Sequence, residues 1–107
     1  MQCICSTITH VVYEWSAGTL EWLAEHGIEP YEVMQALLTG PRWPRPAVTA
    51  EGLAVPSIWG RTDAGRYLVV ILRRDAKPYD WWIVLGRDMT TAEVAEFEQW
   101  EADRDTC

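Results

Sequence analysis

The chain has 107 residues, which is enough for one compact domain and one functional site. Its 49% hydrophobic and 23% charged residues exclude a disordered, collagen-like or low-complexity protein. The net charge of -7 disfavours a protein that binds nucleic acid over its whole surface. The charges are segregated, however, with a net charge of -5 over residues 1–41, +4 over 42–87 and -6 over 88–107. The sequence therefore predicts one cationic surface on an acidic body.

No part of the sequence predicts a membrane segment or a bound metal. The longest apolar run, residues 67–72, is far shorter than the roughly 18 residues of a membrane-spanning helix, and no secretory signal pattern opens the chain. We therefore expect a cytoplasmic protein. The three cysteines lie at the chain ends, and with His10 and His26 they do not form the spaced ligand pairs of a zinc site. The cysteines are Cys3, Cys5 and Cys107. We therefore expect no disulfide framework, no bound metal and no cofactor.

The first part of the chain predicts a strand followed by two helices. Residues 8–15 are β-branched and aromatic, which is typical of a strand. Ser16 is suited to cap a helix that ends at Gly27, and a second helix begins at Pro30 and ends before Gly40. Apolar spacing predicts inward positions at Leu20, Leu23 and Ala24 in the first helix, and at Val33, Met34, Leu37 and Leu38 in the second.

The middle of the chain predicts a loop and three strands. Residues 41–56 contain four prolines, which favour an irregular loop. Residues 57–62, 66–73 and 79–86 are strand-like and are separated by short polar turns, so we expect an antiparallel meander. The second and third of these strands are apolar on both faces, so both faces of the sheet require a cover.

The end of the chain predicts a third helix that begins at Thr91. Thr90 and Glu93 form a capping box, and Met89 with Val94 forms the hydrophobic staple around it. Val94, Phe97 and Trp100 would point inward, whereas Glu93, Glu96, Glu98 and Glu101 would face water or a partner. The order β-α-α-β-β-β-α predicts a single α+β domain over residues 1–107 with a small antiparallel sheet and flexible ends at 1–7 and 103–107.

Several short motifs, taken in order, resemble the BrnT family. They are Glu14-Trp15, His26-Gly27-Ile28, the segment 60–70, and Arg87 followed by Thr90, Glu93 and Phe97. The resemblance spans about Tyr13 to Trp100 and implies a RelE-like fold and a bacterial toxin of a type II toxin–antitoxin system. It further implies a ribonuclease that a cognate antitoxin protein neutralises. The chain departs from the family pattern at Ser16, at Thr19 and Leu20 or Leu23 in the first predicted helix, and at Glu25 and Asp88. The changes at Glu25 and Asp88 and in the helix remove positive charge.

Metal-independent RNA cleavage requires groups that stabilise phosphoryl charge and groups that move protons. Arg61 and Arg87 are the first choice for phosphoryl charge, because guanidinium is permanently charged and binds phosphate through two nitrogens. Tyr67 and His26 are the candidates for proton transfer. The alternatives are surface ion pairs for the arginines, a helix cap for His26 and a half-buried strand residue for Tyr67. The expected RNA-binding residues are Arg42, Trp43, Arg45, Arg66, Arg73 and Arg74.

Two other functions fit the same sequence. One is a non-catalytic module that binds a partner protein through exposed tryptophans, Trp43 above all, and through its acidic last helix. The other is an acidic inhibitor that mimics nucleic acid with the carboxylates from Glu93 to Asp105. With the toxin hypothesis, the expected partners are RNA and an antitoxin, and the chain would form a homo-oligomer or a hetero-oligomer with that antitoxin.

Overall fold

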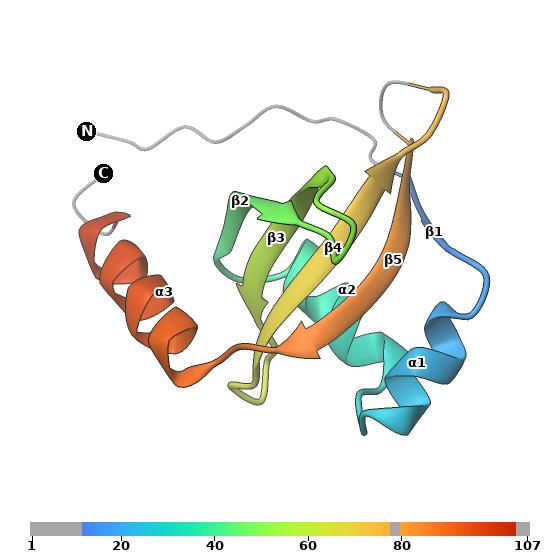
Figure 1. Cartoon of the computed structure of the whole chain (residues 1–107). Helices are drawn as coiled ribbons and strands as arrows, with labels where there is room; N and C mark the ends of the chain where they lie inside the picture. The colour runs from blue at the N-terminus through green and yellow to red at the C-terminus, as the bar shows by residue number, and fades with distance from the viewer. Residues whose placement is uncertain (1–11, 78–79, 105–107) are drawn as a thin grey trace.

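The computed structural model describes residues 12–77 and 80–104 (Figure 1). The elements are β1 Val12–Trp15, α1 Thr19–Glu25, α2 Pro30–Leu38, β2 Arg42–Val48, β3 Ala54–Arg61, β4 Tyr67–Arg74, β5 Asp80–Asp88 and α3 Thr91–Arg104. The predicted α+β class is confirmed, with one strand more than expected. Helix α3 includes residues 103 and 104, which were expected to be flexible. The three cysteines, His10 and the expected flexible segment 1–7 lie outside the described residues.

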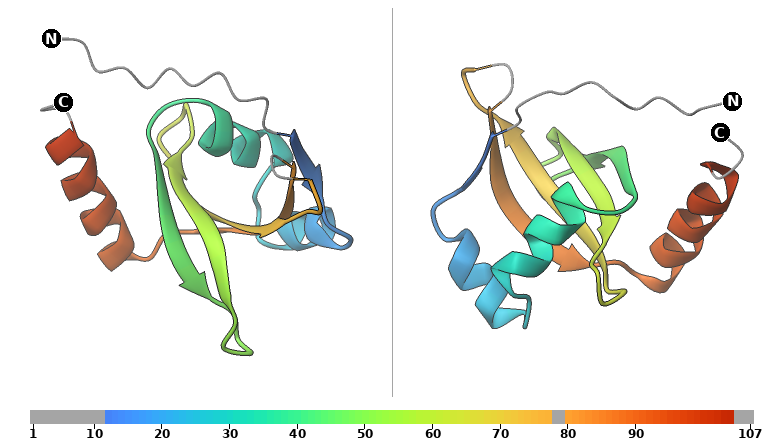
Figure 2. Two further views of the ribbon diagram at one scale, coloured as in Figure 1. Left: turned by 90° about the horizontal axis from the view of Figure 1, so that it is seen from above. Right: turned by 180° about the vertical axis from the view of Figure 1, so that it is seen from behind.

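The sheet has the strand order β1-β5-β4-β3-β2. β3, β4 and β5 form the predicted antiparallel meander, and β2 adds a further antiparallel strand. β1 runs parallel to β5, so the sheet is mixed rather than purely antiparallel. Helices α1 and α2 lie on one side of the sheet and α3 on the other (Figure 2), which provides the expected cover of both faces.

Strand β2 and the first residues of β3 replace most of the loop that the prolines predict. β2 pairs with β3 along its whole length, with Pro44 opposite Ile58 and Pro46 opposite Pro56. β2 is an edge strand, and every second N–H of an edge strand points away from the sheet. Prolines at alternate positions can therefore lie in β2 without removing a ladder hydrogen bond. The predicted loop is wrong because the sequence does not reveal which strand will be at the edge.

The two faces of the sheet carry separate apolar clusters. Toward α1 and α2, the buried side chains include Leu23, Val33, Leu37, Leu68 and Ile83. Toward α3, they are Trp59, Val69, Met89 and Phe97. Helix α2 lies so close to β3 that a Cβ added at Gly60 would be 2.6 Å from the carbonyl oxygen of Ala36. Glycine at this position permits the close approach.

Helix α1 differs from its prediction at the start and on its inner face. It begins at Thr19 with Gly18 as the N-cap, so Ser16 does not cap it. Leu23 is buried as expected, but Leu20 is 46% exposed and Ala24 is exposed. Thr19 is buried instead, and its hydroxyl donates hydrogen bonds to the carbonyl oxygens of Ile83 and Val84 at 3.0 and 2.8 Å. In α2, Val33 and Leu37 are buried, whereas Leu38 is 55% exposed.

A β-bulge in β5 changes which face its residues occupy. Leu72 pairs with Ile83 and Ile71 pairs with Leu85, so Val84 is an extra residue between the two pairs. Ile83 therefore lies in the cluster under α1 and α2, although simple alternation predicts that it shares a face with Leu85 and Arg87. Arg87 lies on the α3 face, beside Leu85.

Candidate functional site

The α3 face of the sheet gathers one anion-binding side chain from each of four neighbouring strands. Arg45 comes from β2, Arg61 from β3, Tyr67 from β4 and Arg87 from β5. Strand alternation and the bulge in β5 together place all four on this face. We call these four residues the sheet cluster.

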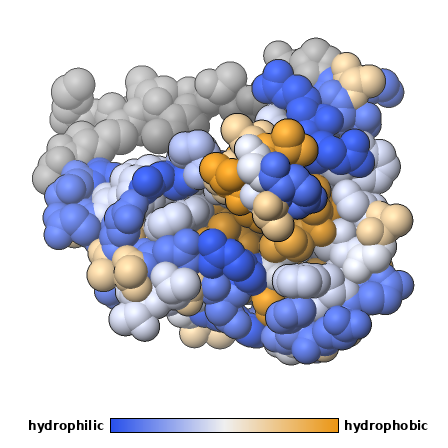
Figure 3. All heavy atoms as spheres, viewed as in Figure 1, coloured by the Kyte–Doolittle hydropathy of each residue, from blue (hydrophilic) through white to orange (hydrophobic). Residues whose placement is uncertain are grey.

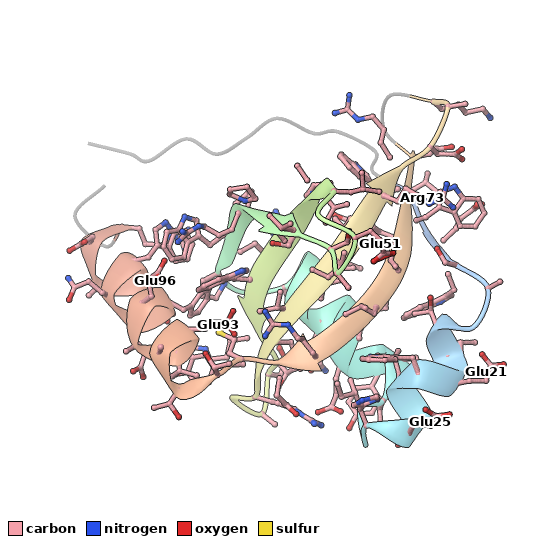
Figure 4. The ribbon with its side chains drawn as sticks, viewed as in Figure 1. Glu21, Glu25, Glu51, Arg73, Glu93 and Glu96 are labelled. Atoms are coloured by element: carbon pink, nitrogen blue, oxygen red, sulfur yellow. The ribbon has the colours of Figure 1, made fainter. Side chains whose placement is uncertain are left out.

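Each member of the sheet cluster binds a different carboxylate of α3. Arg45 binds Glu96, Arg61 donates to Glu101 at 2.6 Å, and Tyr67 donates to Glu98 at 3.0 Å. Figure 4 shows Glu93 and Glu96 extending from the side of α3 that is nearer the sheet. The expectation that the glutamates face water or a partner holds for Glu96 and Glu98, which stay exposed, and is wrong for Glu93 and Glu101, which are largely covered by the sheet.

The fourth contact, between Arg87 and Glu93, is bidentate. Both terminal nitrogens of Arg87 donate to Glu93, at 2.7 and 2.8 Å. These bonds, together with the capping hydrogen bond from Thr90, lower the pKa of Glu93 to about 2 from its usual 4.5, whereas burial acts in the opposite direction. The bonds from Glu93 likewise raise the pKa of Arg87. Both groups are therefore charged at neutral pH.

The arginines chosen first from the sequence lie on either side of β4. Arg61 is opposite Tyr67, and Arg87 is opposite Val69, two residues further along β4. From strand spacing and rise, their Cα atoms are about 12 Å apart. Long guanidinium side chains can reach toward one ligand over this distance. Each now binds a carboxylate from the helix above it.

Aromatic rings fill the space between the sheet cluster and α3. Trp43 stacks on Trp100 with ring centroids 5.0 Å apart and 6° between the planes, and the guanidinium of Arg45 lies 4.2 Å from the Trp43 ring centroid. Phe97 is fully buried and packs edge-on against Tyr67. Trp43 is thus half-buried within the chain, which corrects the prediction that it is exposed. Tyr67 is half-buried, as expected for a strand residue, which was the alternative to a role in proton transfer.

The other predicted arginines lie elsewhere and do not join the sheet cluster. Arg66 donates to both carboxylate oxygens of Asp88 at 2.7 and 3.0 Å, and to Glu32 at 3.1 Å. These bonds lower the pKa of Asp88 and raise that of Arg66. Arg42 donates to the Leu37 carbonyl at the end of α2. Arg73 and Arg74, at the far end of β4, lie over the rings of Trp82 and Trp81.

His26 has the structural role that was the alternative to catalysis. It is the C-cap residue of α1, and its Nδ1 is 2.8 Å from the Trp22 carbonyl oxygen. Its ring also stacks on the Trp22 ring with centroids 4.0 Å apart. These contacts hold His26 at the end of α1, and none of them is with a residue of the sheet cluster.

An apolar cavity of about 600 Å³ adjoins the sheet cluster between the β2–β3 hairpin and the floor of β4 and β5. Figure 3 shows apolar side chains gathered in the middle of this face. The lining includes Ala47, Val55, Ile71 and Leu85, with Arg87 and Glu93 at the rim. The sequence gives no signal for this cavity, because its walls come from distant segments.

Within residues 12–77 and 80–104, no three His, Cys, Asp or Glu side chains cluster in a way that could hold a metal ion. None of the described helices has the length and apolar composition required to cross a membrane. No protein-family model, curated protein or solved structure matches the chain.

Proposed function

We propose that the chain is a BrnT-like toxin of a bacterial toxin–antitoxin system and that it binds and cleaves RNA without a metal. The observation that supports this most is the sheet cluster, in which three guanidinium groups and a phenol each already bind a negatively charged oxygen. Groups that bind carboxylate in this way also bind phosphate. The order of the motifs that resemble the BrnT family supports the same proposal.

The sheet cluster offers groups for two of the tasks in RNA cleavage. The ribose 2′-oxygen attacks phosphorus and loses its proton to solvent, and the bond from phosphorus to O5′ breaks. Arg61 and Arg87 would stabilise the charge on the phosphoryl oxygens. The Tyr67 hydroxyl would give its proton to O5′ and recover one from solvent. The products would be a 2′,3′-cyclic phosphate and a 5′-hydroxyl.

The aromatic rings would contribute to binding once they are accessible. Trp43 and Trp59 lie on the same face as Arg45, and their rings are 5.6 Å apart at 75°. Bases of single-stranded RNA stack on such rings, and each stack contributes about 1–3 kcal/mol. The proposal places the protein in the cytoplasm, where it would meet RNA and a cognate antitoxin protein.

The alternative of a non-catalytic interaction module has less support from the contacts. Its main residues were Trp43 and the carboxylates of the last helix, and these bind within the chain. The same contacts weaken the proposal of an inhibitor that displays its carboxylates to another protein.

The test is incubation of the purified protein with single-stranded RNA in excess EDTA, with analysis of the product ends. We expect cyclic phosphate ends, and we expect Tyr67→Phe and Arg87→Gln each to lower the cleavage rate about 100-fold. Arg73→Gln is the control, because Arg73 lies at the far end of β4. RNA that stays intact with the folded protein, and also with a variant in which Glu96, Glu98 and Glu101 are all glutamine, would refute the proposed activity.

A further inference from the structure

The glutamates of α3 bind the sheet in a regular pattern. Around the helix, Glu96 lies on one side of the buried Phe97 and Glu98 and Glu101 lie on the other, and each meets a different strand. With Glu93 they span about 12 Å along the helix axis. A row of negatively charged oxygens on this scale resembles the phosphates of a short single-stranded polyanion.

The charge distribution fits this likeness. The segment 42–87, which supplies the sheet cluster, has a net charge of +4, whereas the segment 88–107, which contains α3, has a net charge of -6. Most acidic side chains of a surface helix point to solvent, because burial disfavours a charge. In α3, the side chains of Glu93 and Glu101 are only 19% and 21% exposed, and each is matched by an arginine.

Helix α3 is also joined to the sheet in a way that allows it to separate. It follows β5 after the short link Met89–Thr90, and it contacts the sheet through side chains, chiefly Phe97, Trp100 and the glutamates. The sheet keeps its own core under α1 and α2, where α3 makes no contribution to the cluster of buried residues. An isolated helix of 14 residues is marginal in water, so a released α3 would lose its protection against hydrogen exchange.

We propose that α3 is an intramolecular polyanion mimic that occupies the RNA-binding surface and competes with RNA for it. This inference rests on the proposed function and adds its regulation. The apparent affinity for RNA is the affinity of the open form reduced by the fraction of molecules in which α3 is released. Any partner that holds α3 away from the sheet would activate binding, and any that holds it down would inhibit binding.

The first experiment compares RNA affinities by fluorescence anisotropy with a labelled single-stranded oligonucleotide. The α3 variant replaces Glu96, Glu98 and Glu101 with glutamine and keeps Glu93, so the capping box stays intact. The control variant replaces Glu14, Glu21 and Glu25 with glutamine. These side chains are exposed and lie on β1 and α1, away from α3 (Figure 4 labels Glu21 and Glu25), and the net charge changes equally.

We expect the α3 variant to bind RNA at least tenfold more tightly than the wild type, and the control variant to bind within twofold of the wild type. If both variants bind RNA measurably, equal affinities of the α3 variant and the control variant would overturn the inference. Circular dichroism and thermal unfolding show whether each variant is folded.

The second experiment uses the wild-type protein and inorganic polyphosphate as the probe, with hydrogen–deuterium exchange of residues 91–104 as the readout. Competition predicts that polyphosphate removes the protection of α3 while β4 stays protected. Binding of polyphosphate with α3 still protected would overturn the inference.

The two experiments separate the inference from the proposed function. Release of α3 by polyphosphate, without binding or cleavage of RNA by the α3 variant, would refute the RNA function and retain the mimic. Cleavage of RNA by wild-type protein with α3 protected throughout would refute the mimic and retain the function.

Discussion

Arg87 and Glu93 bind each other through two nitrogens and two oxygens, across the link between the last strand and the last helix. Glu93 also accepts the backbone N–H of Thr90 at 2.8 Å, which closes the capping box. One carboxylate thus begins α3 and fixes it to the sheet. The same contact neutralises one of the arginines on which RNA cleavage would depend.

The first prediction concerns acid. The pKa of Glu93 is about 2 in the folded chain and 4.5 without its partners, so the contact stabilises the fold fully above pH 4.5. The free energy of unfolding should lose this contribution as the pH falls from about 4.5 to about 2. Glu93→Gln should flatten this part of the pH profile, because glutamine keeps the cap but does not titrate. Urea unfolding at several pH values measures the free energy of unfolding, with Glu51→Gln as the control. If the pH profiles of the wild type and Glu93→Gln coincide, the prediction is wrong.

The second prediction concerns the approach of α2 to the sheet. Gly60→Ala would place a Cβ 2.6 Å from the Ala36 carbonyl oxygen, so α2 would have to move. We expect a loss of about 1–3 kcal/mol in the free energy of unfolding. Ala54→Ser, at an exposed position of the same strand, should change it by less than about 0.5 kcal/mol. Thermal unfolding of both variants tests this prediction. Equal unfolding midpoints would show that α2 moves away from the added Cβ without loss of stability.

The third prediction separates the two apolar clusters. Leu23 and Phe97 are both fully buried, but Leu23 packs under α1 and α2 and Phe97 under α3. Leu23→Ala should destabilise the whole domain by about 2–5 kcal/mol. Phe97→Ala should release α3. The near-ultraviolet circular dichroism signal of the stacked Trp43 and Trp100 rings should then be lost, whereas the amides of β4 should stay protected against hydrogen exchange. Global unfolding of the Phe97→Ala variant would show instead that α3 is essential to the fold.

The fourth prediction concerns salt. In the α3 variant, Arg45 and Arg61 lose their carboxylate partners and would be free to bind phosphates, whereas Arg87 keeps Glu93. Each phosphate contact with single-stranded nucleic acid contributes about -0.7 to the slope of log affinity against log salt. We expect a slope of about -1.4, and a slope less steep by about 0.7 after a further Arg45→Gln substitution. Arg74→Gln, far from the site, should leave the slope unchanged. RNA titrations at several salt concentrations measure the slope for the α3 variant and for its Arg45→Gln and Arg74→Gln derivatives.

The sequence predicts local features well and long-range ones poorly. The capping box at Thr90, the end of α1 at Gly27 and the meander depend on neighbouring residues, and all are confirmed. Strand β2 depends on its position at the edge of the sheet, which no local pattern reveals.

The candidate site shows the same limit. The sequence identifies Arg61, Tyr67 and Arg87 as candidates, and they lie on one face, whereas it predicts a loop around Arg45. The pairing of α3 carboxylates with these groups joins residues up to 51 positions apart. Helical periodicity identifies the inner side of α3 from its apolar residues, and it gives no indication that the flanking acids have partners.

The bulge at Val84 determines which side of the protein carries the third guanidinium. Val84 is the extra residue in β5, and the hydroxyl of Thr19 holds its carbonyl. A chain that lacked this one residue would turn Arg87 toward Val33 and Leu23, where Gly86 now packs. A charge would then enter the apolar interior, and the sheet cluster would lose one of its three arginines.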